Sequence, residues 1–324
     1  MSRPIVLHLV DDTTAGGVTR VVDHIVTSPE LARDACHRRV VLVGKRPRVR
    51  YPEADIIVSH QSVKWANLPH FVALRLCNPR ARLIHVEHSY TEAFVRRNVA
   101  KKARFHRLLR LTYGLFDAVA AVSHGQADWL SRIGAVAAKK LVVIRSFVDL
   151  SDFAALAPAE GPIRVIGAIG RLEPQKGFDD LIRSFRASSR ADLELHIYGT
   201  GAEEAALTRL AGGDPRIRFM GFVPDTARAM ERLDAVVMPS RWEAYGLVAI
   251  EALAAGRPLF VNGIDGLSDH VTHGALEVPT DGPDAWRAVF DTMPDRVEPP
   301  RDRQTLRELK TDFLTSWRAQ VSAI

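Results

Sequence analysis

The chain has 324 residues, of which 47% are hydrophobic and 25% charged, and its formal net charge is +6. This is the composition of an ordinary soluble globular protein, and it excludes a disordered chain or a bundle of membrane-spanning helices. The length exceeds that of a single core and favours two domains of about 150 residues each.

The cysteine content and the N-terminal segment indicate in which cellular compartment the protein is expected. Cys36 and Cys77 form no CxxC or Cys/His pattern, so neither a disulfide framework nor a zinc site is expected. The first apolar run stops at Asp11 and Asp12, which is too short for a signal sequence, and no other run reaches the length of a membrane span. We therefore expect a cytoplasmic protein, with any membrane association peripheral and at the inner face of the plasma membrane.

Short runs rich in Val and Ile alternate with helix-like segments along the whole chain. This rhythm is typical of buried parallel strands joined by crossover helices and predicts an α/β fold. In the first half the expected strands are Ile5–Val10, Val40–Val43, Ile56–Ser59, Leu83–Val86, Ala118–Val122 and Leu141–Ile144. In the second half they are Arg164–Ile169, Leu193–Tyr198, Ile217–Met220, Ala235–Met238 and Pro258–Val261.

The segment between the two halves reads as a linker, because Pro158, Gly161 and Pro162 cannot continue a helix or a central strand. We expect a first doubly wound domain over residues 1–155 and a second over 156–300. Residues 301–324 carry apolar side chains at helical spacing, such as Phe313 and Trp317. They predict a final helix that packs back on the first domain.

In open α/β sheets ligands bind beyond the carboxyl ends of the strands, so candidate residues are sought just after strands. The segment IGAIGRLEPQKGFDDLIRSF places Arg171 and Lys176 on either side of a loop that opens a helix. Arg offers a fork of donors, Lys a mobile charge, and a helix N-terminus partial positive charge, which together suit a diphosphate leaving group. Gly170 and Gly177 would let the backbone approach the ligand. Taken alone, the two cations fit solvated loop charges as well.

The segment MPSRWEAYGLVAIEALAAGRPL follows a later strand and carries two glutamates, Glu243 and Glu251. Glu243 is expected in the loop, with a helix beginning between Tyr245 and Leu247 and Glu251 on its first or second turn. One carboxylate could accept hydrogen bonds from a sugar and the other from a ribose, while backbone N–H groups of Tyr245, Gly246 and Leu247 hold phosphate or sugar oxygens. The spacing alone fits two ordinary glutamates, but the apolar neighbours of Glu251 favour burial.

Four motifs of the second half, GRLEPQKG, HIYGTGAEEAAL, RIRFMGFVPD and PSRWEAYGLVAIEALAAGRPL, resemble in order and spacing the donor domain of the retaining glycosyltransferases of family 4. The resemblance covers about residues 163–270. It implies the GT-B fold, in which two Rossmann-like doubly wound domains face each other across a cleft. The residues it assigns are Arg171 and Lys176 to the donor pyrophosphate, Glu243 to the transferred sugar, Glu251 to the ribose, and Phe222 and Val223 to the nucleobase.

The first half resembles the same family at the expected places. DDTTAGGVTRVV resembles its glycine pair, so Gly16 and Gly17 would border the donor phosphates and the acceptor. LIHVEHSYTEAF resembles the segment after the fourth strand and implies that His88 lies beside the transferred sugar, while His85 is expected in the core. Ser123 in AVSHGQADWL resembles a serine turn of the family, although a simple helix N-cap explains it equally well.

Two places depart from the family. The usual Pro-Asn-Gly at the interdomain crossover is Arg145, Ser146 and Phe147 here, and the acid after a later Gly-rich turn is Asp269 instead of Glu. The first of these departures affects the expected hinge geometry or a donor contact there. Acceptor specificity cannot be carried over from the family.

The sequence contains no Asp-x-Asp pair, the usual metal-binding motif of the other main glycosyltransferase fold. No metal and no cofactor are therefore expected, and cationic side chains would neutralise the leaving group. The catalytic set that the resemblance implies is His88, Arg171, Lys176 and Glu243. No clear nucleophile is visible, so a same-face displacement with retention is the working mechanism.

Residues 94–111 are basic with interleaved apolar side chains, a pattern typical of an interfacial amphipathic helix on an anionic membrane. A solvated helix with ordinary core contacts fits the same pattern. Nucleic acid is not an expected partner, because no nucleic-acid-binding motif accompanies the charge.

The predicted function is transfer of a hexose-type sugar from a nucleotide diphosphate sugar to a glycan or lipid-linked acceptor, in bacterial polysaccharide or cell-envelope glycan synthesis. Two alternatives stay open: a non-catalytic protein of this fold that binds glycan or membrane, and a sugar-nucleotide epimerase or phosphorylase. A nicotinamide dehydrogenase is disfavoured, because GTGAEE at Gly199–Glu204 lacks the last glycine of GxGxxG.

Overall fold

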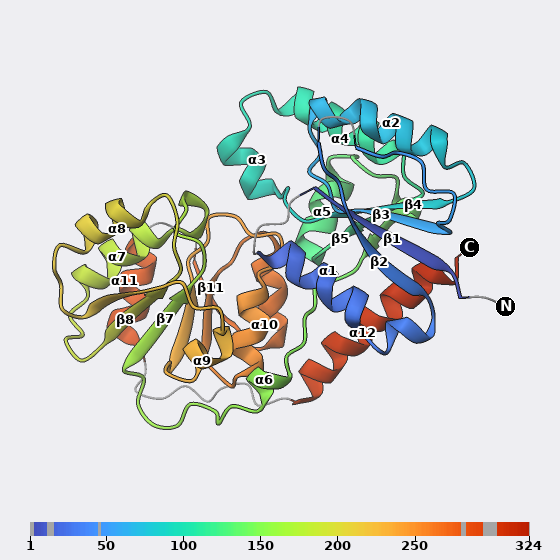
Figure 1. Ribbon diagram of the computed structural model, residues 1–324. Helices are drawn as coiled ribbons and strands as arrows, with labels where there is room; N and C mark the ends of the chain where they lie inside the picture. Colours follow the sequence, from blue (N-terminus) through green and yellow to red (C-terminus); the bar gives the residue numbers. More distant parts are fainter. Residues whose placement is uncertain (1–2, 12–15, 45–46, 280–282, 294–302, 324) are drawn as a thin grey trace. The chain divides into compact units, whose positions relative to one another are not determined.

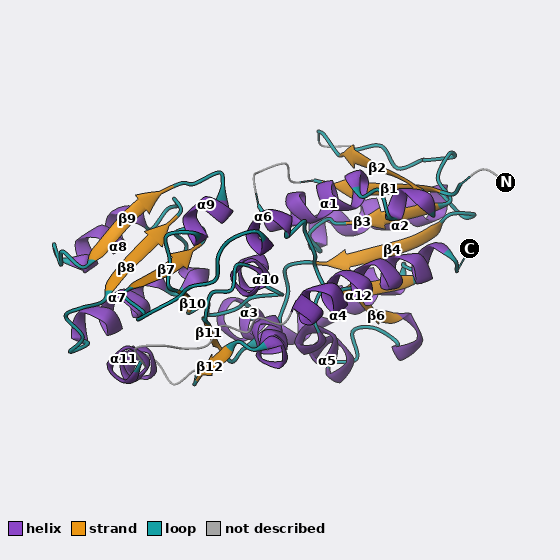
Figure 2. Ribbon diagram, turned by 90° about the horizontal axis from the view of Figure 1, so that it is seen from below, coloured by secondary structure: helices purple, strands orange, loops and turns teal. Residues whose placement is uncertain are grey.

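The computed structural model describes residues 3–11, 16–44, 47–279, 283–293 and 303–323. It divides into two compact units, residues 1–148 with 307–324 and residues 149–306. The division falls after Val148, a few residues before the expected boundary at 155, and the last segment rejoins the first unit at Arg307. Each unit is an α/β layer structure with helices against a parallel sheet (Figure 1 and Figure 2).

The sheet of the first unit has six parallel strands in the order β2-β1-β3-β4-β5-β6. Its strands are β1 Ile5–Val10, β2 Cys36–Val41, β3 Ile56–Ser59, β4 Arg82–Glu87, β5 Ala118–Ala121 and β6 Leu141–Val143. The helices of this unit are α1 Gly17–Thr27, α2 Leu68–Cys77, α3 Glu92–Asn98, α4 Lys102–Gly114, α5 His124–Arg132 and most of α12 Arg303–Val321.

The sheet of the second unit is also six-stranded and parallel, in the order β12-β11-β10-β7-β8-β9. Its strands are β7 Val165–Ile169, β8 Glu194–Tyr198, β9 Ile217–Gly221, β10 Ala235–Met238, β11 Leu259–Asn262 and β12 Leu276–Val278. The helices are α6 Ser151–Ala154, α7 Phe178–Ala187, α8 Glu204–Ala211, α9 Thr226–Met230, α10 Leu247–Ala254 and α11 Pro283–Thr292.

Two strands differ from the sequence prediction, and both lie at a sheet edge. The strand expected at Val40–Val43 begins at Cys36, and β12 was not expected at all. An edge strand is covered on fewer sides than a central one, so it needs no continuous apolar run. Arg38 and Arg39 stand exposed in the middle of β2, which hides that strand from a search for apolar runs.

Helix α12 packs on the first unit (Figure 1). Leu309, Phe313 and Trp317 are almost fully buried, and these are the apolar positions that predicted the helix. At its rim Arg318 pairs with Asp34 at 2.7 Å, and Lys310 pairs with Glu30 at 2.7 Å. The Lys310 ammonium lowers the pKa of the Glu30 carboxyl to about 2.

The basic segment 94–111 forms two short helices, α3 and α4, instead of one interfacial helix. Its apolar side chains pack into the first unit: Val95, Leu108 and Leu109 are buried, and Phe94 and Phe105 pack against the same core. The amphipathic pattern is thus explained by the core of the protein. The basic side chains remain exposed, namely Arg96, Arg97, Lys101, Lys102, Arg104, Arg107 and Arg110.

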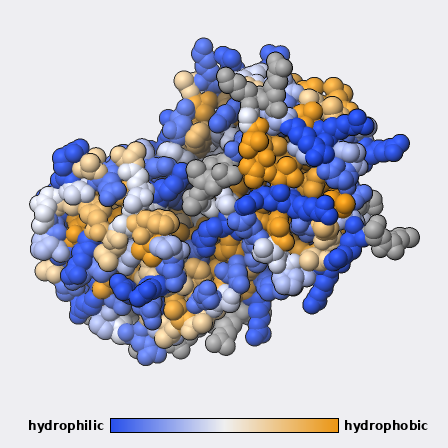
Figure 3. Space-filling model, in the orientation of Figure 1, coloured by the Kyte–Doolittle hydropathy of each residue, from blue (hydrophilic) through white to orange (hydrophobic). Residues whose placement is uncertain are grey.

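No helix in the described part of the chain is long and apolar enough to cross a membrane. Hydrophilic residues cover most of the face that Figure 3 shows, with smaller apolar groups between them.

Candidate active site

The cationic loop and the glutamate loop of the second unit are neighbours because the strands that precede them pair in the sheet. β7 leads into the loop that carries Arg171 and Lys176, β10 leads into the loop that carries Glu243, and Ala235 of β10 lies opposite Ile166 of β7. Parallel neighbours end at the same edge of a sheet, so the two loops meet there.

Lys176 and Glu243 form a direct ion pair at this edge. Their side chains are only 16% and 13% exposed, so the pair is largely shielded from solvent. The Ser240 hydroxyl donates to the same Glu243 carboxylate at 3.4 Å. The residue predicted to hold phosphate and the residue predicted to hold sugar are therefore each other's partners.

Arg171 stands apart from this pair. Its side chain is 64% exposed, and its guanidinium lies 3.1 Å from the Glu173 carboxylate. A cation in this position keeps most of its water, whereas the Lys176 ammonium is paired with Glu243 in a shielded position.

Glycine at position 177 lets the two loops approach closely. Gly177 has φ +66°, a left-handed conformation that side-chain-bearing residues rarely adopt, and it caps α7. A Cβ atom here would lie 2.4 Å from the carbonyl oxygen of Pro239, which is backbone and cannot swing away. The contact between the cationic loop and the glutamate loop therefore requires glycine.

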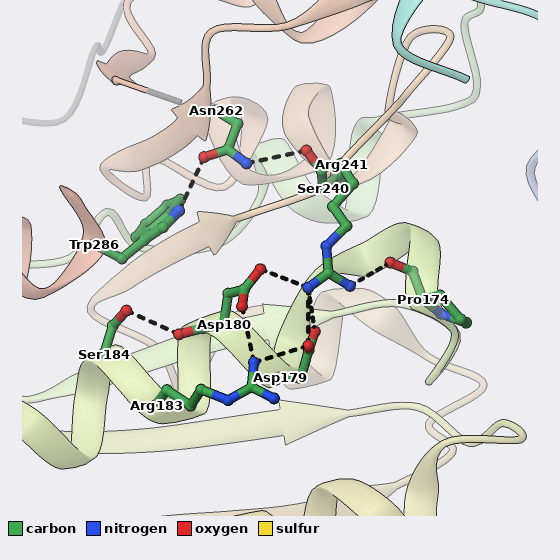
Figure 4. A network of polar contacts seen from close by, with 9 residues as sticks. All are labelled: Pro174, Asp179, Asp180, Arg183, Ser184, Ser240, Arg241, Asn262 and Trp286. Carbon is green, nitrogen blue, oxygen red and sulfur yellow. Dashed lines mark hydrogen bonds and ion pairs between the residues drawn. The ribbon is translucent and has the colours of Figure 1, made fainter. Parts of the chain in front are cut away.

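Arg241 links the loops on which the site residues stand (Figure 4). Its guanidinium donates to the carbonyl of Pro174 at 3.0 Å and to the carboxylate of Asp179 at 2.8 Å, and it also contacts Asp180. Burial alone would raise the pKa of Asp179, but Arg241 and Arg183 outweigh it and hold that pKa below its ordinary value. The network joins the loop after β10 to the loop after β7 and to the first turn of α7.

The glutamate loop is fixed on its other side as well. The N–H of Glu243 points to Asp265 at 3.4 Å, and the carbonyl of Glu243 accepts from Gly266 at 3.0 Å. The Asn262 amide donates to the carbonyl of Ser240 at 3.1 Å, and Trp286 donates to Asn262 at 2.9 Å (Figure 4). Glu243 is thus placed by contacts of its own backbone N–H and carbonyl groups.

Helix α10 begins as predicted. Gly246 caps it at φ +89°, Leu247 is its first residue, and Glu251 falls on the second turn. The carbonyl of Tyr245 is held by the His270 imidazole at 2.8 Å. Glu251 is fully buried, which confirms the expectation of low exposure and places its carboxylate out of contact with solvent.

Phe222 and Val223 directly follow β9, which is parallel to β8, and β8 is in turn parallel to β7. The carboxyl ends of these three strands therefore lie at the same edge of the second sheet, where the loop with Arg171 and Lys176 also begins. Phe222 is 64% exposed, an unusual state for a phenyl ring. Such a ring is suited to stacking against a planar ligand.

In the first unit Gly16 caps α1, and Gly17 is the first residue of that helix. Gly16 has φ −172°, an extended conformation open to any residue, so the backbone does not demand glycine there.

His88 directly follows β4, and the turn around it is held by Glu87. The Glu87 carboxylate accepts from the N–H groups of Ser89 at 2.7 Å and Tyr90 at 3.0 Å, and from the hydroxyl of Tyr113. His88 itself bonds to His60 at 2.8 Å and is half-buried. His85 points to the other face among Phe71, Tyr113 and Phe116, which confirms its assignment to the core.

Sequence reasoning missed Arg241, Asp265 and His60. Arg241 and Asp265 act through backbone and carboxylate contacts that have no motif of their own. His60 did carry a signal, because it follows β3 directly, as His88 follows β4, and the two strands are neighbours.

The architecture defines a class of protein. The structure of HepE from Anabaena in complex with UDP and glucose matches this chain with a TM-score of 0.71 over 99% of both chains, at 16% sequence identity. At that identity the likeness concerns the fold, which is the GT-B fold of glycosyltransferases.

The sequence comparisons identify the family. Residues 13–152 match Glycosyltransferase Family 4, and residues 163–292 match Glycosyl transferases group 1. The chain belongs to glycosyltransferase family 4. It is 31% identical to the glycogen synthase of Mycobacterium tuberculosis over 220 residues, 64% of this chain and 52% of that one. It is 32% identical to the D-inositol 3-phosphate glycosyltransferase of Jonesia denitrificans over 204 residues, 53% and 47% of the two chains. The matched region spans about half the length of these relatives.

Proposed function

We propose that this chain is a retaining, metal-independent glycosyltransferase that moves a hexose-type sugar from a nucleotide diphosphate donor. The observation that carries the proposal is the shielded Lys176–Glu243 pair at the carboxyl ends of β7 and β10. A half-buried ammonium paired with a carboxylate is a site from which a diphosphate can take the cation and a sugar hydroxyl the anion.

The proposed mechanism follows from these two groups. When the donor binds, the Lys176 ammonium turns from Glu243 to the diphosphate, and Arg171 adds its exposed fork of donors from the same loop. Charge develops on the diphosphate as the glycosidic bond breaks, and cations held in a shielded site stabilise that charge. Glu243, released from Lys176, accepts hydrogen bonds from the hydroxyls of the sugar. Neutralisation of the leaving group by these side chains makes a metal unnecessary.

A second set of contacts completes the assignment. Glu251 holds the ribose once the site rearranges around the donor, Phe222 and Val223 contact the nucleobase, and Gly16 and Gly17 border the phosphates. His88 is the polar contact to the transferred sugar in the first unit. We assign the acceptor to glycans or lipid-linked sugars, in polysaccharide or cell-envelope glycan assembly at the cytoplasmic side of the membrane. The similarity to a protein named glycogen synthase supports a glycan acceptor.

A thermal-shift screen against UDP-, GDP-, ADP-, dTDP- and CMP-sugars in EDTA tests the donor site. One diphosphate donor is expected to stabilise the protein, by about 2.7 kcal/mol at a concentration of 100 Kd, because it binds only the folded chain. UDP-glucose is the first donor to test, since HepE was crystallised with UDP and glucose.

Glu251→Ala is expected to abolish this stabilisation, whereas Lys176→Ala should only reduce it, because the Lys176 ammonium acts mainly on the charge that develops as the leaving group departs. Arg218→Ala, which removes an exposed cation paired with Glu194 on the same sheet, should leave it intact. No stabilisation of the wild-type chain by any of the donors would refute the proposed function and favour a non-catalytic role.

The exposed basic side chains of α3 and α4 lead to a proposal about location. Anionic lipids attract basic residues at a surface with about 1 kcal/mol each. We expect the protein to float with anionic vesicles at low salt and to detach as the salt concentration rises.

Replacing Arg96, Arg97, Lys101 and Lys102 together by glutamine should abolish flotation. The matched control replaces four exposed arginines of the second unit, Arg209, Arg218, Arg228 and Arg287. Equal loss in both variants would point to net charge, and no flotation of the wild-type chain would remove the membrane proposal.

A further inference from the structure

Four histidines of the first unit form one continuous hydrogen-bonded chain that ends at His88. His37 Nδ1 lies 3.0 Å from His8 Nε2, His8 Nδ1 lies 2.9 Å from His60 Nε2, and His60 Nδ1 lies 2.8 Å from His88 Nε2. His8, His37 and His60 are buried, and His88 is the half-buried end.

The sheet order produces this chain. The four residues come from the neighbouring strands β2, β1, β3 and β4 or directly follow them. Val6 lies opposite His37, and Val58 lies opposite His8, so each histidine stands two positions further along than the previous one. A step of two keeps all four side chains on one face of the sheet.

All four imidazole rings of the histidine chain are neutral near pH 7. Burial lowers the pKa of His8 and His60 well below the ordinary value, and it lowers the pKa of His37 and of His88 to about 4. A neutral imidazole has one N–H and one lone pair. His8 and His60 use both nitrogens in the chain, so each donates on one side and accepts on the other. All the N–H groups must therefore point in the same direction along the chain.

The surroundings of His37, at the end of the histidine chain opposite to His88, determine that direction. His37 Nε2 is buried and has no hydrogen-bond partner among the described residues. If each histidine donated toward His37, a buried N–H would be left on His37 Nε2 without an acceptor. If each donated toward His88, a buried lone pair would be left there instead. A buried N–H without a partner is the rarer of the two in proteins.

The surroundings of His37 agree with this choice. The ring of Trp317 packs against His8 and His37 with centroid distances of 5.5 and 6.4 Å. Its Nε1–H can only donate, and it too has no partner within the described structure. Asp34, whose charge acts on His37, is paired with Arg318. The Trp317 ring beside His37 thus offers a donor and no acceptor, which favours a lone pair on His37 Nε2.

We propose that His37, His8 and His60 are positioning residues that fix His88 in the Nδ1–H tautomer, so that His88 meets its ligand as a hydrogen-bond donor and not as a general base. The ligand group it suits is an acceptor oxygen, a sugar hydroxyl or a phosphate oxygen. That second part rests on the proposed function, whereas the tautomer does not.

The test reads the tautomer directly, by two-bond 1H–15N correlation of the histidine side chains in the 15N-labelled full-length protein. The wild-type chain is expected to show His88 protonated at Nδ1 and unchanged between pH 8 and about pH 5, above its lowered pKa. His88 protonated at Nε2, or a mixture of tautomers, would overturn the proposal whether or not the protein transfers sugar.

Two variants of His60 separate a positioning role from mere packing. In His60→Asn the side-chain amide takes the place of Nδ1–H, so the tautomer and most of the turnover should be retained. In His60→Phe the donor is lost, and His88 should become a tautomer mixture with turnover about five- to tenfold lower. His106→Phe removes a histidine of the same unit that is not part of the histidine chain. It should change neither the tautomer of His88 nor the turnover. Equal behaviour of the Asn and Phe variants would contradict the proposal.

His37→Glu is the sharpest variant, because it acts three strands away from His88. A carboxylate at position 37 offers His8 Nε2 an acceptor, which should reverse every hydrogen bond and move the His88 proton to Nε2. If this variant does not fold, the His60 pair still decides. A folded variant with His88 still protonated at Nδ1 would overturn the proposed control by the far end. A fixed Nδ1–H tautomer in a chain that consumes no donor sugar would refute the proposed function alone.

Discussion

Replacing Lys176 with alanine is expected to lower kcat about 100- to 1000-fold, the usual effect of losing one group that stabilises transition-state charge. Donor binding should weaken far less, because the ground-state diphosphate carries less charge at the bridging oxygen than the departing one does. The side chain is 16% exposed, so its charge acts through a poorly screened environment. Initial rates at saturating donor give kcat, and titration calorimetry gives the donor Kd.

The control for this variant is Arg218→Ala, which removes a cation from the same sheet and only a surface ion pair. Lys176 is the only lysine between Asp149 and Leu306. Acetylation of the lysines with and without donor, read by mass spectrometry, therefore reports its protection as a single site. An unchanged kcat in Lys176→Ala would show that the ammonium does not act at the leaving group.

Glu243→Gln is expected to change two measured quantities in opposite directions. Turnover should fall about 100-fold or more, because the amide binds the sugar hydroxyls less well than the carboxylate. The affinity for the free nucleoside diphosphate should rise about 5- to 30-fold, because Lys176 no longer has to leave a charged partner worth about 1–2 kcal/mol. The ion pair seen in the structure is thus an obstacle to binding the nucleotide alone.

A double-mutant cycle with Lys176→Ala isolates this competition. In the Lys176→Ala background, Glu243→Gln should no longer improve nucleotide affinity, because the cation that it frees is absent. Improvement of the same size in both backgrounds would mean that Glu243 opposes the diphosphate by long-range repulsion, and the ion pair would then have no part in binding.

The central strands were predictable from the sequence, since burial on both faces gives β3, β5 and β10 continuous apolar runs. The edge strands β2 and β12 were not, because they are half-exposed and carry polar residues, whereas the edge strands β6 and β9 were predicted. The segment 94–111 shows a related ambiguity: its apolar positions match a membrane face and a core face equally. Only the packing of Val95 and Leu108 into the first unit distinguishes the two.

The candidate site was predictable residue by residue but not as a set of contacts. Arg171, Lys176 and Glu243 stand in recognisable loops after strands, yet the Lys176–Glu243 pair depends on the pairing of β7 with β10, which no local pattern encodes. The histidine chain depends likewise on the order β2-β1-β3-β4. The spacing of positions 8, 37, 60 and 88 in the sequence shows no regularity that would predict their alignment on one face of the sheet.

The return of α12 to the first unit has a consequence for how the chain matures on the ribosome. Phe313 and Trp317 complete a core whose other members are synthesised before residue 149, so the whole second unit emerges in between. The first unit is therefore completed only after the second unit has been synthesised. Until Phe313 and Trp317 leave the exit tunnel, the surface around His8 and His37 lacks its cover, and the nascent first unit stays open to chaperones and proteases while the second unit is made.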